Sequence, residues 1–349
     1  MHPEPSPDAG PLVRWLADER AGLARRQRDR FVAAGGADVA VVSGPPDSIS
    51  FGERLRALVR AERPAGLVVL GSGAIPLATA RDLRDLVAAA AADAPVALAN
   101  NRYSADVVAI ARAWPVLADL PELPSDNALP RWLEEVAGYG LADLRRRWRL
   151  AIDIDGPLDL VLIGGCDEAE AADVHGIELG RASAAIAAVR RVAADPAAEL
   201  VVAGRTSAAT LAWLERSTAS RTRAIIEERG LRTSRPGQRP PASVLGTLLD
   251  RDGPEAFGAL LAGLGDAAVV DTRVLLAHRL GADEAAWPGP EDRFASDLLL
   301  AERIADPWLH ELTASASAAP IPVLLGGHTL VGPGLRLVVG RPPRGPRWT

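Results

Sequence analysis

Apolar and polar positions follow one another in blocks along the first half of the chain, and these blocks predict its secondary structure. Apolar residues that recur at helical spacing between charges predict amphipathic helices. Short unbroken apolar runs that end at glycine or proline predict strands. The predicted strands lie within residues 37–46, 65–79, 94–101 and 146–165, and the predicted helices within residues 11–34, 50–64, 78–92, 104–113 and 125–140.

The same alternation continues in the second half with different sequences. Strands are predicted at "AELVVAGR" (198–205) and at the start of "DAAVVDTRVLLAHRLG" (266–281), whose remainder predicts a helix. Two more are predicted within "APIPVLLGGHTLVGPGLRLVVG" (319–340), joined by a glycine turn. Further helices are predicted within residues 178–194, 207–217 and 243–265.

The predicted strands are apolar throughout, which is typical of strands covered on both faces. Together with the intervening helices they predict an α/β fold, a mostly parallel sheet with helices on both faces. A length of 349 residues suffices for two domains. We predict a disordered lead-in over residues 1–10, a first domain over 11–165 and a second α/β domain over 177–349, with the boundary in the polar, glycine-bounded segment 164–176.

Charge and basic-residue usage exclude several classes of function. The net charge is −6 and the arginines are scattered, so we expect neither a nucleic-acid partner nor a membrane partner. All 39 basic residues are arginine, which excludes a P-loop lysine or a Schiff-base lysine. A phosphate group must therefore be bound by arginine, by backbone N–H groups or through a metal. These properties leave a small-molecule or nucleotide ligand as the expected partner.

The single cysteine, the polar start of the chain and the length of its apolar runs indicate the cellular compartment. Cys166 is the only cysteine, which excludes a disulfide within the chain and a multi-cysteine metal site and suits a reducing compartment. The acidic, proline-rich start lacks the features of a signal peptide. The apolar runs fall well short of the ~18 residues of a transmembrane helix. We therefore expect a cytoplasmic protein.

The stretch "IDIDGPLDL" (152–160) holds the most concentrated acidic chemistry beside an apolar run. Asp153 and Asp155 stand at its predicted strand end, and carboxylate oxygens are the ligands that hard divalent cations prefer. The alternative is structural, because Asp155-Gly-Pro can form a turn and Asp159 can stabilise the start of a following helix. The residues alone leave both interpretations open.

Three segments of the first half follow one another in a recognisable order: "VVLGSGAIPLAT" (68–79), "VALANNRYSADVVAI" (96–110) and "LAIDIDGPLDL" (150–160). In these segments the chain resembles the MobA-like nucleotidyltransferases with a GT-A-type fold, over about residues 35–163, and the 2-phospho-lactate guanylyltransferase family is the nearest to it. The resemblance implies transfer of a nucleotidyl group to a small phosphorylated or sugar-like acceptor. It also implies that Asp153 and Asp155 hold Mg²⁺ and that Asp155 takes part in catalysis.

Three features depart from that family. Ala74 stands in "GSGAIPL", where the family has a metal-binding aspartate, and Gly156 replaces a threonine of the later motif. The chain also opens without the glycine-rich loop that cradles the triphosphate in the family. A second hypothesis is therefore a catalytically degenerate relative that serves as a binding or scaffolding subunit, for example in a homodimer.

Other polar residues at predicted strand ends are candidate ligand contacts, because strand carboxyl ends line ligand sites in open α/β sheets. A glycine turn or a helix cap explains several of them equally well. In the first half the candidates are Ser72, Gly73, Asn100, Asn101 and Arg102. In the second half they are Arg205, Asp271 and Arg273 for binding and His328 as a general base.

A third hypothesis follows from the second-half candidates. It places the active site in the C-terminal domain and predicts that Arg205, Asp271, Arg273 and His328 converge on one pocket. His278 lies inside a predicted helix, and we expect it to be structural.

Overall fold

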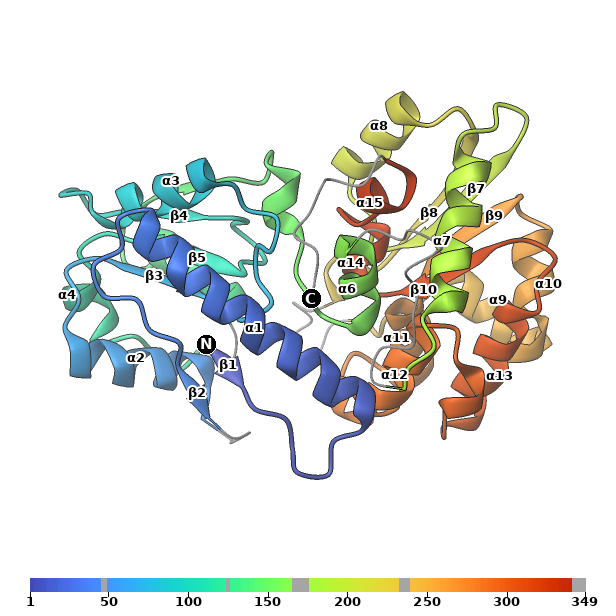
Figure 1. Cartoon of the computed structure of the whole chain (residues 1–349), viewed down its shortest axis with the longest axis horizontal. Helices are drawn as coiled ribbons and strands as arrows, with labels where there is room; N and C mark the ends of the chain where they lie inside the picture. The colour runs from blue at the N-terminus through green and yellow to red at the C-terminus, as the bar shows by residue number, and fades with distance from the viewer. Residues whose placement is uncertain (45–48, 124–125, 165–175, 232–238, 341–349) are drawn as a thin grey trace. The chain divides into compact units, whose positions relative to one another are not determined.

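The computed structural model describes residues 1–44, 49–123, 126–164, 176–231 and 239–340, which form two compact units (Figure 1). The first unit consists of Met1–Ala9 and Leu16–Ile154, and the second of Gly10–Trp15 and Asp155 onwards. The division after Ile154 comes earlier in the chain than residue 165. The predicted boundary segment 164–176, with Cys166 and its acidic residues, lies almost entirely outside the described residues.

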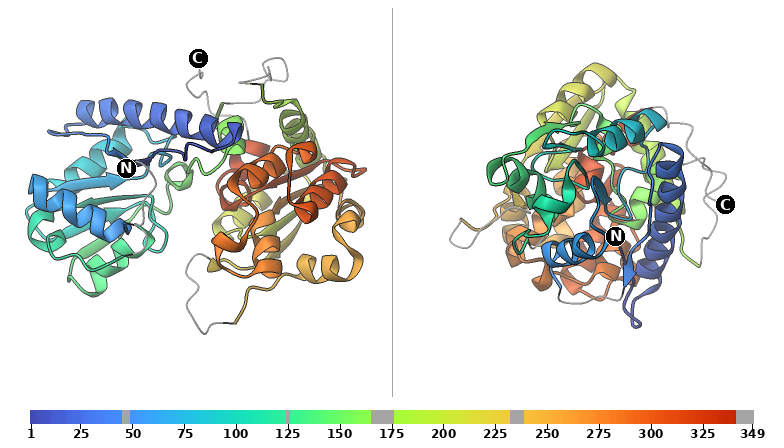
Figure 2. Two further views of the ribbon diagram at one scale, coloured as in Figure 1. Left: turned by 90° about the horizontal axis from the view of Figure 1, so that it is seen from below. Right: turned by 90° about the vertical axis from the view of Figure 1, so that its left-hand side faces the viewer.

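The first unit contains a four-stranded sheet of order β3-β5-β4-β6 and a two-stranded parallel pair of β1 with β2. Its strands are β1 (His2–Pro3), β2 (Ser43–Gly44), β3 (Leu67–Leu70), β4 (Val96–Ala99), β5 (Val107–Ile110) and β6 (Gly140–Asp143). Its helices are α1 (Pro11–Ala33, whose first turn belongs to the second unit), α2 (Phe51–Glu62), α3 (Ala80–Ala90), α4 (Ala113–Leu117) and α5 (Leu129–Glu135). Figures 1 and 2 show α1 as one uninterrupted helix.

Strand β5 shows how the first sheet is covered on both faces. Val108 and Ile110 pack with residues of α2, α4 and α5, whereas Val107 and Ala109 pack with residues of α3. Alternate residues of a strand point to opposite faces, so two separate apolar clusters require helices on both sides. The sheet is mixed, because β5 runs antiparallel to β3 and β4, while β4 and β6 are parallel.

Two sequence-based expectations for the first unit were wrong. Residues 104–113 were expected to be a helix but contain strand β5. A short, wholly apolar run that is buried on both faces cannot be distinguished from a buried helix by periodicity. The expected disordered start is also ordered: the Met1 amine donates to Leu70 O at 2.7 Å, Ser72 N donates to Met1 O at 2.9 Å, and His2 is buried.

The second unit contains a four-stranded, fully parallel sheet of order β10-β9-β7-β8. Its strands are β7 (Glu199–Gly204), β8 (Arg221–Ile226), β9 (Ala267–Asp271) and β10 (Val323–Gly326). Its helices are α6 (Pro157–Gly164), α7 (Gly180–Ala193), α8 (Ala208–Ser217), α9 (Val244–Asp252), α10 (Phe257–Ala262), α11 (Thr272–Leu280), α12 (Pro290–Asp297), α13 (Pro307–Ser317), α14 (His328–Val331) and α15 (Leu335–Val339).

The strand order of the second sheet fixes where a ligand site can form. The chain adds β8 on one side of β7 and then returns to add β9 and β10 on the other side. The connections therefore leave β7 and β9 in opposite directions, and crevices at such a switch point are where ligands bind in open α/β sheets. Helix α7 packs against β7, β9 and β10, and α14 packs against β7 and β9.

The α/β class predicted from the sequence is confirmed by both sheets and their flanking helices. The second strand expected within residues 319–340 is wrong, because α14 and α15 follow β10 there. Gly332 and Gly334 separate these two short helices. None of the helices in the described part of the chain combines the length and the apolar character that crossing a membrane requires.

The start of α3 carries a buried acidic cap whose contribution to stability can be measured. Asp82 accepts hydrogen bonds from Thr79 N at 2.8 Å and Thr79 Oγ1 at 2.7 Å, and Arg147 Nη1 donates to it at 2.8 Å. Burial alone would raise the pKa of Asp82, but these bonds from Thr79 and Arg147 outweigh it and lower the pKa below its ordinary value. The cap therefore stabilises the fold in the ionised form.

We predict that Asp82→Asn lowers the free energy of unfolding at pH 7 by about 1–2 kcal/mol. Because the folded-state pKa is lowered, this stabilisation is present above the unfolded-state pKa of about 4 and is lost as the pH falls through the folded-state value. Urea unfolding at pH 7 and pH 3 measures the difference, which should shrink at pH 3. The exposed Asp93→Asn serves as the control, and equal effects of the two variants would contradict the prediction.

Candidate functional site

A buried ion pair joins the carboxyl ends of β7 and β9. Arg205 directly follows β7, and its Nε and Nη2 donate to Oδ2 and Oδ1 of Asp271, the last residue of β9, at 2.6 and 3.1 Å. Both side chains are buried. Such a two-point contact between a guanidinium and a carboxylate fixes both planes. Asp271 also caps α11, because its Oδ1 accepts from Arg273 N at 3.2 Å.

Gly204 makes room for this ion pair. Its φ of +124° lies in a region that residues with a side chain rarely adopt. A Cβ at this position would also stand 2.3 Å from Asp271 Cβ. The glycine before Arg205 is therefore required by the close approach of β7 to the aspartate of β9.

Two buried threonines extend the cross-links to the remaining elements of this edge. Thr272 Oγ1 donates to Gly326 O at 3.2 Å, which joins the start of α11 to the end of β10. Thr206 Oγ1 donates to Val331 O at 2.9 Å, which joins the end of β7 to α14. The ends of β7, β9 and β10 are thus tied together by side chains as well as by the sheet.

A second, partly buried ion pair joins the first turn of α11 to the last residue of α12. The two terminal nitrogens of Arg273 on α11 contact the two carboxylate oxygens of Asp297 on α12, with Nη2 to Oδ2 at 2.6 Å. Burial alone would lower the pKa of Arg273, but the charge and hydrogen bonds of Asp297 raise it above its ordinary value. Arg273 is therefore a permanent cation. A Cβ on Gly327 would lie 3.7 Å from its Nε.

Arg293 on α12 is the least satisfied cation of this region. Its Nη1 reaches Glu284 Oε2 at 3.4 Å, and its guanidinium lies over the Trp287 ring at 5.7 Å. Among the described residues its Nε is buried without a hydrogen-bond partner. Burial lowers the pKa of Arg293, and the nearby positive charge of Arg273 lowers it further. Two guanidinium groups thus lie close enough to repel each other.

The start of α6 adds two carboxyl groups. Asp159 is buried, and its Oδ2 accepts from the backbone N–H groups of Asp155 and Gly156, both at 2.9 Å. This is the helix-start role that the structural interpretation of the sequence gave to Asp159. Burial, followed by the neighbouring charge of Asp155, raises the pKa of Asp159 to about 8. At neutral pH its carboxyl group is therefore largely uncharged.

These side chains line one pocket of about 230 Å³ in the second unit. Its charged and titratable lining residues are Asp155, Asp159, Arg205, Arg273, Glu284, Arg293, Asp297 and His328. The exposed His328 comes from the first turn of α14, directly after Gly327. Arg205, Arg273 and His328, three candidates from the sequence, therefore line the same pocket. Asp271, the fourth candidate, is not among the lining residues but pairs with Arg205.

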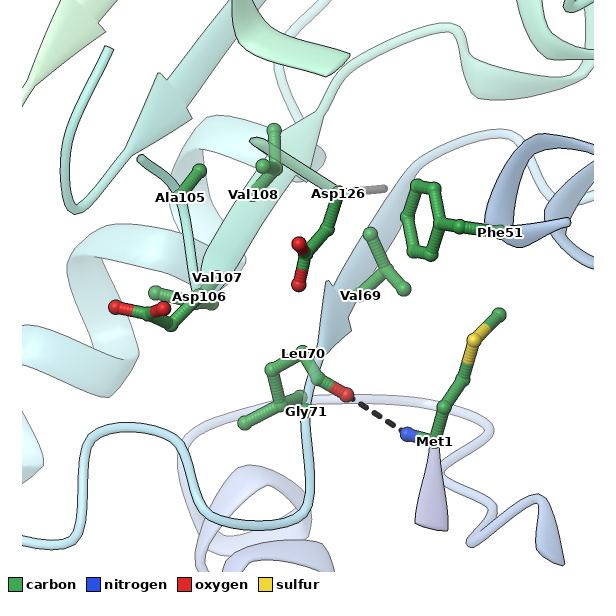
Figure 3. A pocket seen from close by; sticks show the side chains of 10 residues that line it. All are labelled: Met1, Phe51, Val69, Leu70, Gly71, Ala105, Asp106, Val107, Val108 and Asp126. Atoms are coloured by element: carbon green, nitrogen blue, oxygen red, sulfur yellow. Dashed lines mark hydrogen bonds between the residues drawn. The ribbon is translucent and has the colours of Figure 1, made fainter. Parts of the chain in front are cut away.

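A smaller pocket of about 70 Å³ lies in the first unit at the end of β3 and the start of β5 (Figure 3). Its walls are mainly apolar, with Phe51 and Val69 among them. Figure 3 shows the Asp126 carboxylate pointing into it and the Asp106 carboxylate pointing away. The Met1 amine borders the same space, and burial lowers its pKa.

The first-unit sequences that resemble the nucleotidyltransferases lie next to each other. Ala74 and Asp153 form an isolated antiparallel bridge, and Ile154 N donates to Gly73 O at 3.1 Å. A Cβ on Gly73 would stand 2.7 Å from Asp153 Oδ1 and 2.8 Å from Arg20 Nε. Gly73 and Asp153 are therefore neighbours, whereas no regular strand forms over residues 150–155.

The remaining candidates of the first unit have structural contacts. Ser72 Oγ lies 3.1 Å from His2 Nδ1, with both side chains buried. The Asn100 amide contacts Asp106, Val107 and Leu150, which fixes the connection between β4 and β5. Asn101 Oδ1 accepts from Tyr103 N at 2.9 Å, and Arg102 pairs with Glu134 at 2.6 Å. His278 is likewise held between Ser243 N and Asp250.

Metal ligation was predicted for Asp153 and Asp155, which fall in the first and the second unit, respectively. Among the described residues no three histidine, cysteine, aspartate or glutamate side chains are grouped so as to hold a metal ion. Mg²⁺ needs only one or two carboxylates when phosphate oxygens complete its shell. The predicted Mg²⁺ therefore stays a prediction.

Comparison with known proteins gives no relative. No model of a protein family matches the chain, and neither the curated proteins nor the solved structures contain a significant match. The site must therefore be interpreted from its own geometry.

Replacing Gly204 tests how closely the carboxyl ends of β7 and β9 are packed at Asp271. We predict that Gly204→Ala lowers the free energy of unfolding by about 2–4 kcal/mol, because the new Cβ requires an unfavourable φ and meets Asp271. Gly180→Ala is the matched control, since a Cβ at Gly180 meets nothing within 4 Å. Chemical denaturation of both variants measures the difference, and a Gly204 variant as stable as the control would show that the edge relaxes freely.

Proposed function

We propose that the second unit binds a small phosphate monoester in the pocket at the carboxyl ends of β7, β9 and β10. The observation that carries this proposal is the pair of guanidinium groups, Arg273 and Arg293, which both line that pocket and lie near each other. Two neighbouring, partly buried cations are stabilised by an anion with several acceptor oxygens, and guanidinium groups match phosphate geometry.

The charges around the two arginines support an anionic ligand. Asp297 compensates Arg273, and Asp271 compensates Arg205, so neither ion pair carries a net charge. Asp155 adds a further carboxyl group to the lining. Asp159 adds little negative charge near neutral pH because its pKa is about 8. Glu284 is half exposed and contacts Arg293 at 3.4 Å, a separation at which an incoming phosphate can displace it.

His328 gives the same pocket a group for proton transfer. A neutral imidazole can accept or donate a proton near neutral pH. Its position at the rim, after the two glycines that end β10, is compatible with general base chemistry on a bound ester. The proposal therefore extends to an enzyme whose active site lies in the second unit.

The binding proposal predicts a specific loss on removal of one arginine. Isothermal titration of the full chain with n-propyl phosphate should show binding, and Arg293→Gln should weaken it at least tenfold, since a charge-assisted contact is lost. The affinity should also fall as salt is added. Arg251→Gln, an exposed arginine on α9, is the matched control and should bind as the wild type does.

Two outcomes would count against this function. One is the absence of any binding heat with n-propyl phosphate in the wild type at low salt. The other is equal weakening by Arg293→Gln and Arg251→Gln, which would reflect overall charge. Unfolding of Arg293→Gln by urea checks that the variant keeps its fold.

A second candidate function belongs to the first unit and is supported by one observation. The segments around Ala74 and Asp153, which resemble the MobA-like nucleotidyltransferases, contact each other through a backbone bridge. We propose as this candidate that the unit binds a nucleoside triphosphate whose Mg²⁺ is held by Asp153. Arg20, beside Gly73, adds a cation near Asp153.

Titration with GTP in the presence and absence of Mg²⁺ tests this candidate. We predict Mg²⁺-dependent binding that Asp153→Asn weakens at least tenfold and that Asp93→Asn leaves unchanged, because one carboxylate ligand is removed. Binding without turnover would support the degenerate, non-catalytic relative. Binding that is absent, or that is independent of both Mg²⁺ and Asp153, would contradict the candidate.

A further inference from the structure

We infer that the ligand of the second-unit pocket carries hydroxyl groups beside its phosphate, as a small phosphorylated polyol does. This inference rests on the proposed phosphate site and extends it to the acidic residues that line the same pocket. The acidic wall is formed by Asp155 and Asp159 at the start of α6, and the basic wall by Arg273 and Arg293.

The acidic wall offers acceptors to a ligand. Asp159 uses one oxygen, Oδ2, to accept both backbone N–H groups of the turn. Its other oxygen accepts no hydrogen bond from the described residues, although the side chain lines the pocket. The Asp155 side chain lines the pocket next to it. Hydroxyl groups of a ligand are donors, and carboxyl oxygens can accept hydrogen bonds from them.

The two walls lie within the span of one small molecule. Gly156, whose N–H binds Asp159, lies against α12: a Cβ on it would stand 3.4 Å from Phe294 and 3.6 Å from Asp297 Oδ2. Asp297 is in turn paired with Arg273. The turn at Gly156, which binds Asp159, therefore lies next to the ion pair of Asp297 with Arg273.

The size and charge of the pocket limit the ligand further. A volume of about 230 Å³ corresponds to roughly eight water molecules at about 30 Å³ each, which suits a ligand of about ten non-hydrogen atoms. A second phosphate group would have to face Asp155, and like charges at short range are unfavourable. One phosphate and a short hydroxylated chain satisfy both walls.

A matched pair of esters tests the inference on the full chain. Glycerol 3-phosphate and n-propyl phosphate have the same three-carbon chain and the same anion but differ in two hydroxyl groups. By isothermal titration we expect the wild type to bind glycerol 3-phosphate at least tenfold more tightly. Asp155→Asn should bring the ratio of the two affinities close to one, while the exposed Glu311→Gln on α13 should leave it unchanged.

The outcomes separate this inference from the proposed function. If neither ester binds, the phosphate site itself fails. If both bind with equal affinity, the phosphate site stands and the hydroxyl inference is overturned. A preference for glycerol 3-phosphate that survives both Asp155→Asn and Asp159→Asn, with both variants folded by circular dichroism, also overturns it. Loss of the preference in either variant supports it.

Discussion

The buried ion pair of Arg205 with Asp271 fixes the carboxyl ends of β7 and β9 and the start of α11 in the second unit. Two charges removed from water are stable only when they are paired and hydrogen-bonded, and removal of one partner typically costs about 3–5 kcal/mol. Here one carboxylate binds Arg205 at the end of β7, ends β9 and caps α11. Because Gly204 must leave space for it, backbone conformation, sheet edge and helix start are fixed together.

From this fixed edge the chemistry of the pocket follows. With Asp271 occupied by Arg205, Arg273 turns to Asp297, and Arg293 is left with the half-exposed Glu284. The result is a pocket in which one partly buried guanidinium, that of Arg293, has only a long contact with a half-exposed carboxylate. An anion placed there satisfies donors that the fold does not, which is the physical basis of the proposed phosphate site. The switch point between β7 and β9 puts that guanidinium where parallel sheets place ligands.

The sequence predicts the alternating α/β pattern and several of these residues, because both depend on local order along the chain. Arg205, Asp271 and His328 directly follow or end apolar runs, so their placement at strand ends can be inferred. The pairing of Arg273 with Asp297 cannot, since it depends on how α12 docks against α11. The place of Glu284 in the pocket is a similar case, whereas the helix-start role of Asp159 was one of the two interpretations drawn from the sequence. Strand β5 was misjudged because burial on both faces removes the alternation that identifies a strand.

The location of a bound oxyanion tests the central claim most directly. Tungstate is a tetrahedral dianion with a strong anomalous signal, and crystals of the full chain grown with it would show where such an anion binds. The account predicts an anomalous peak within hydrogen-bonding distance of both Arg273 and Arg293. A pocket without tungstate in crystals that bind it elsewhere, or a peak on the acidic wall at Asp155, would contradict the account.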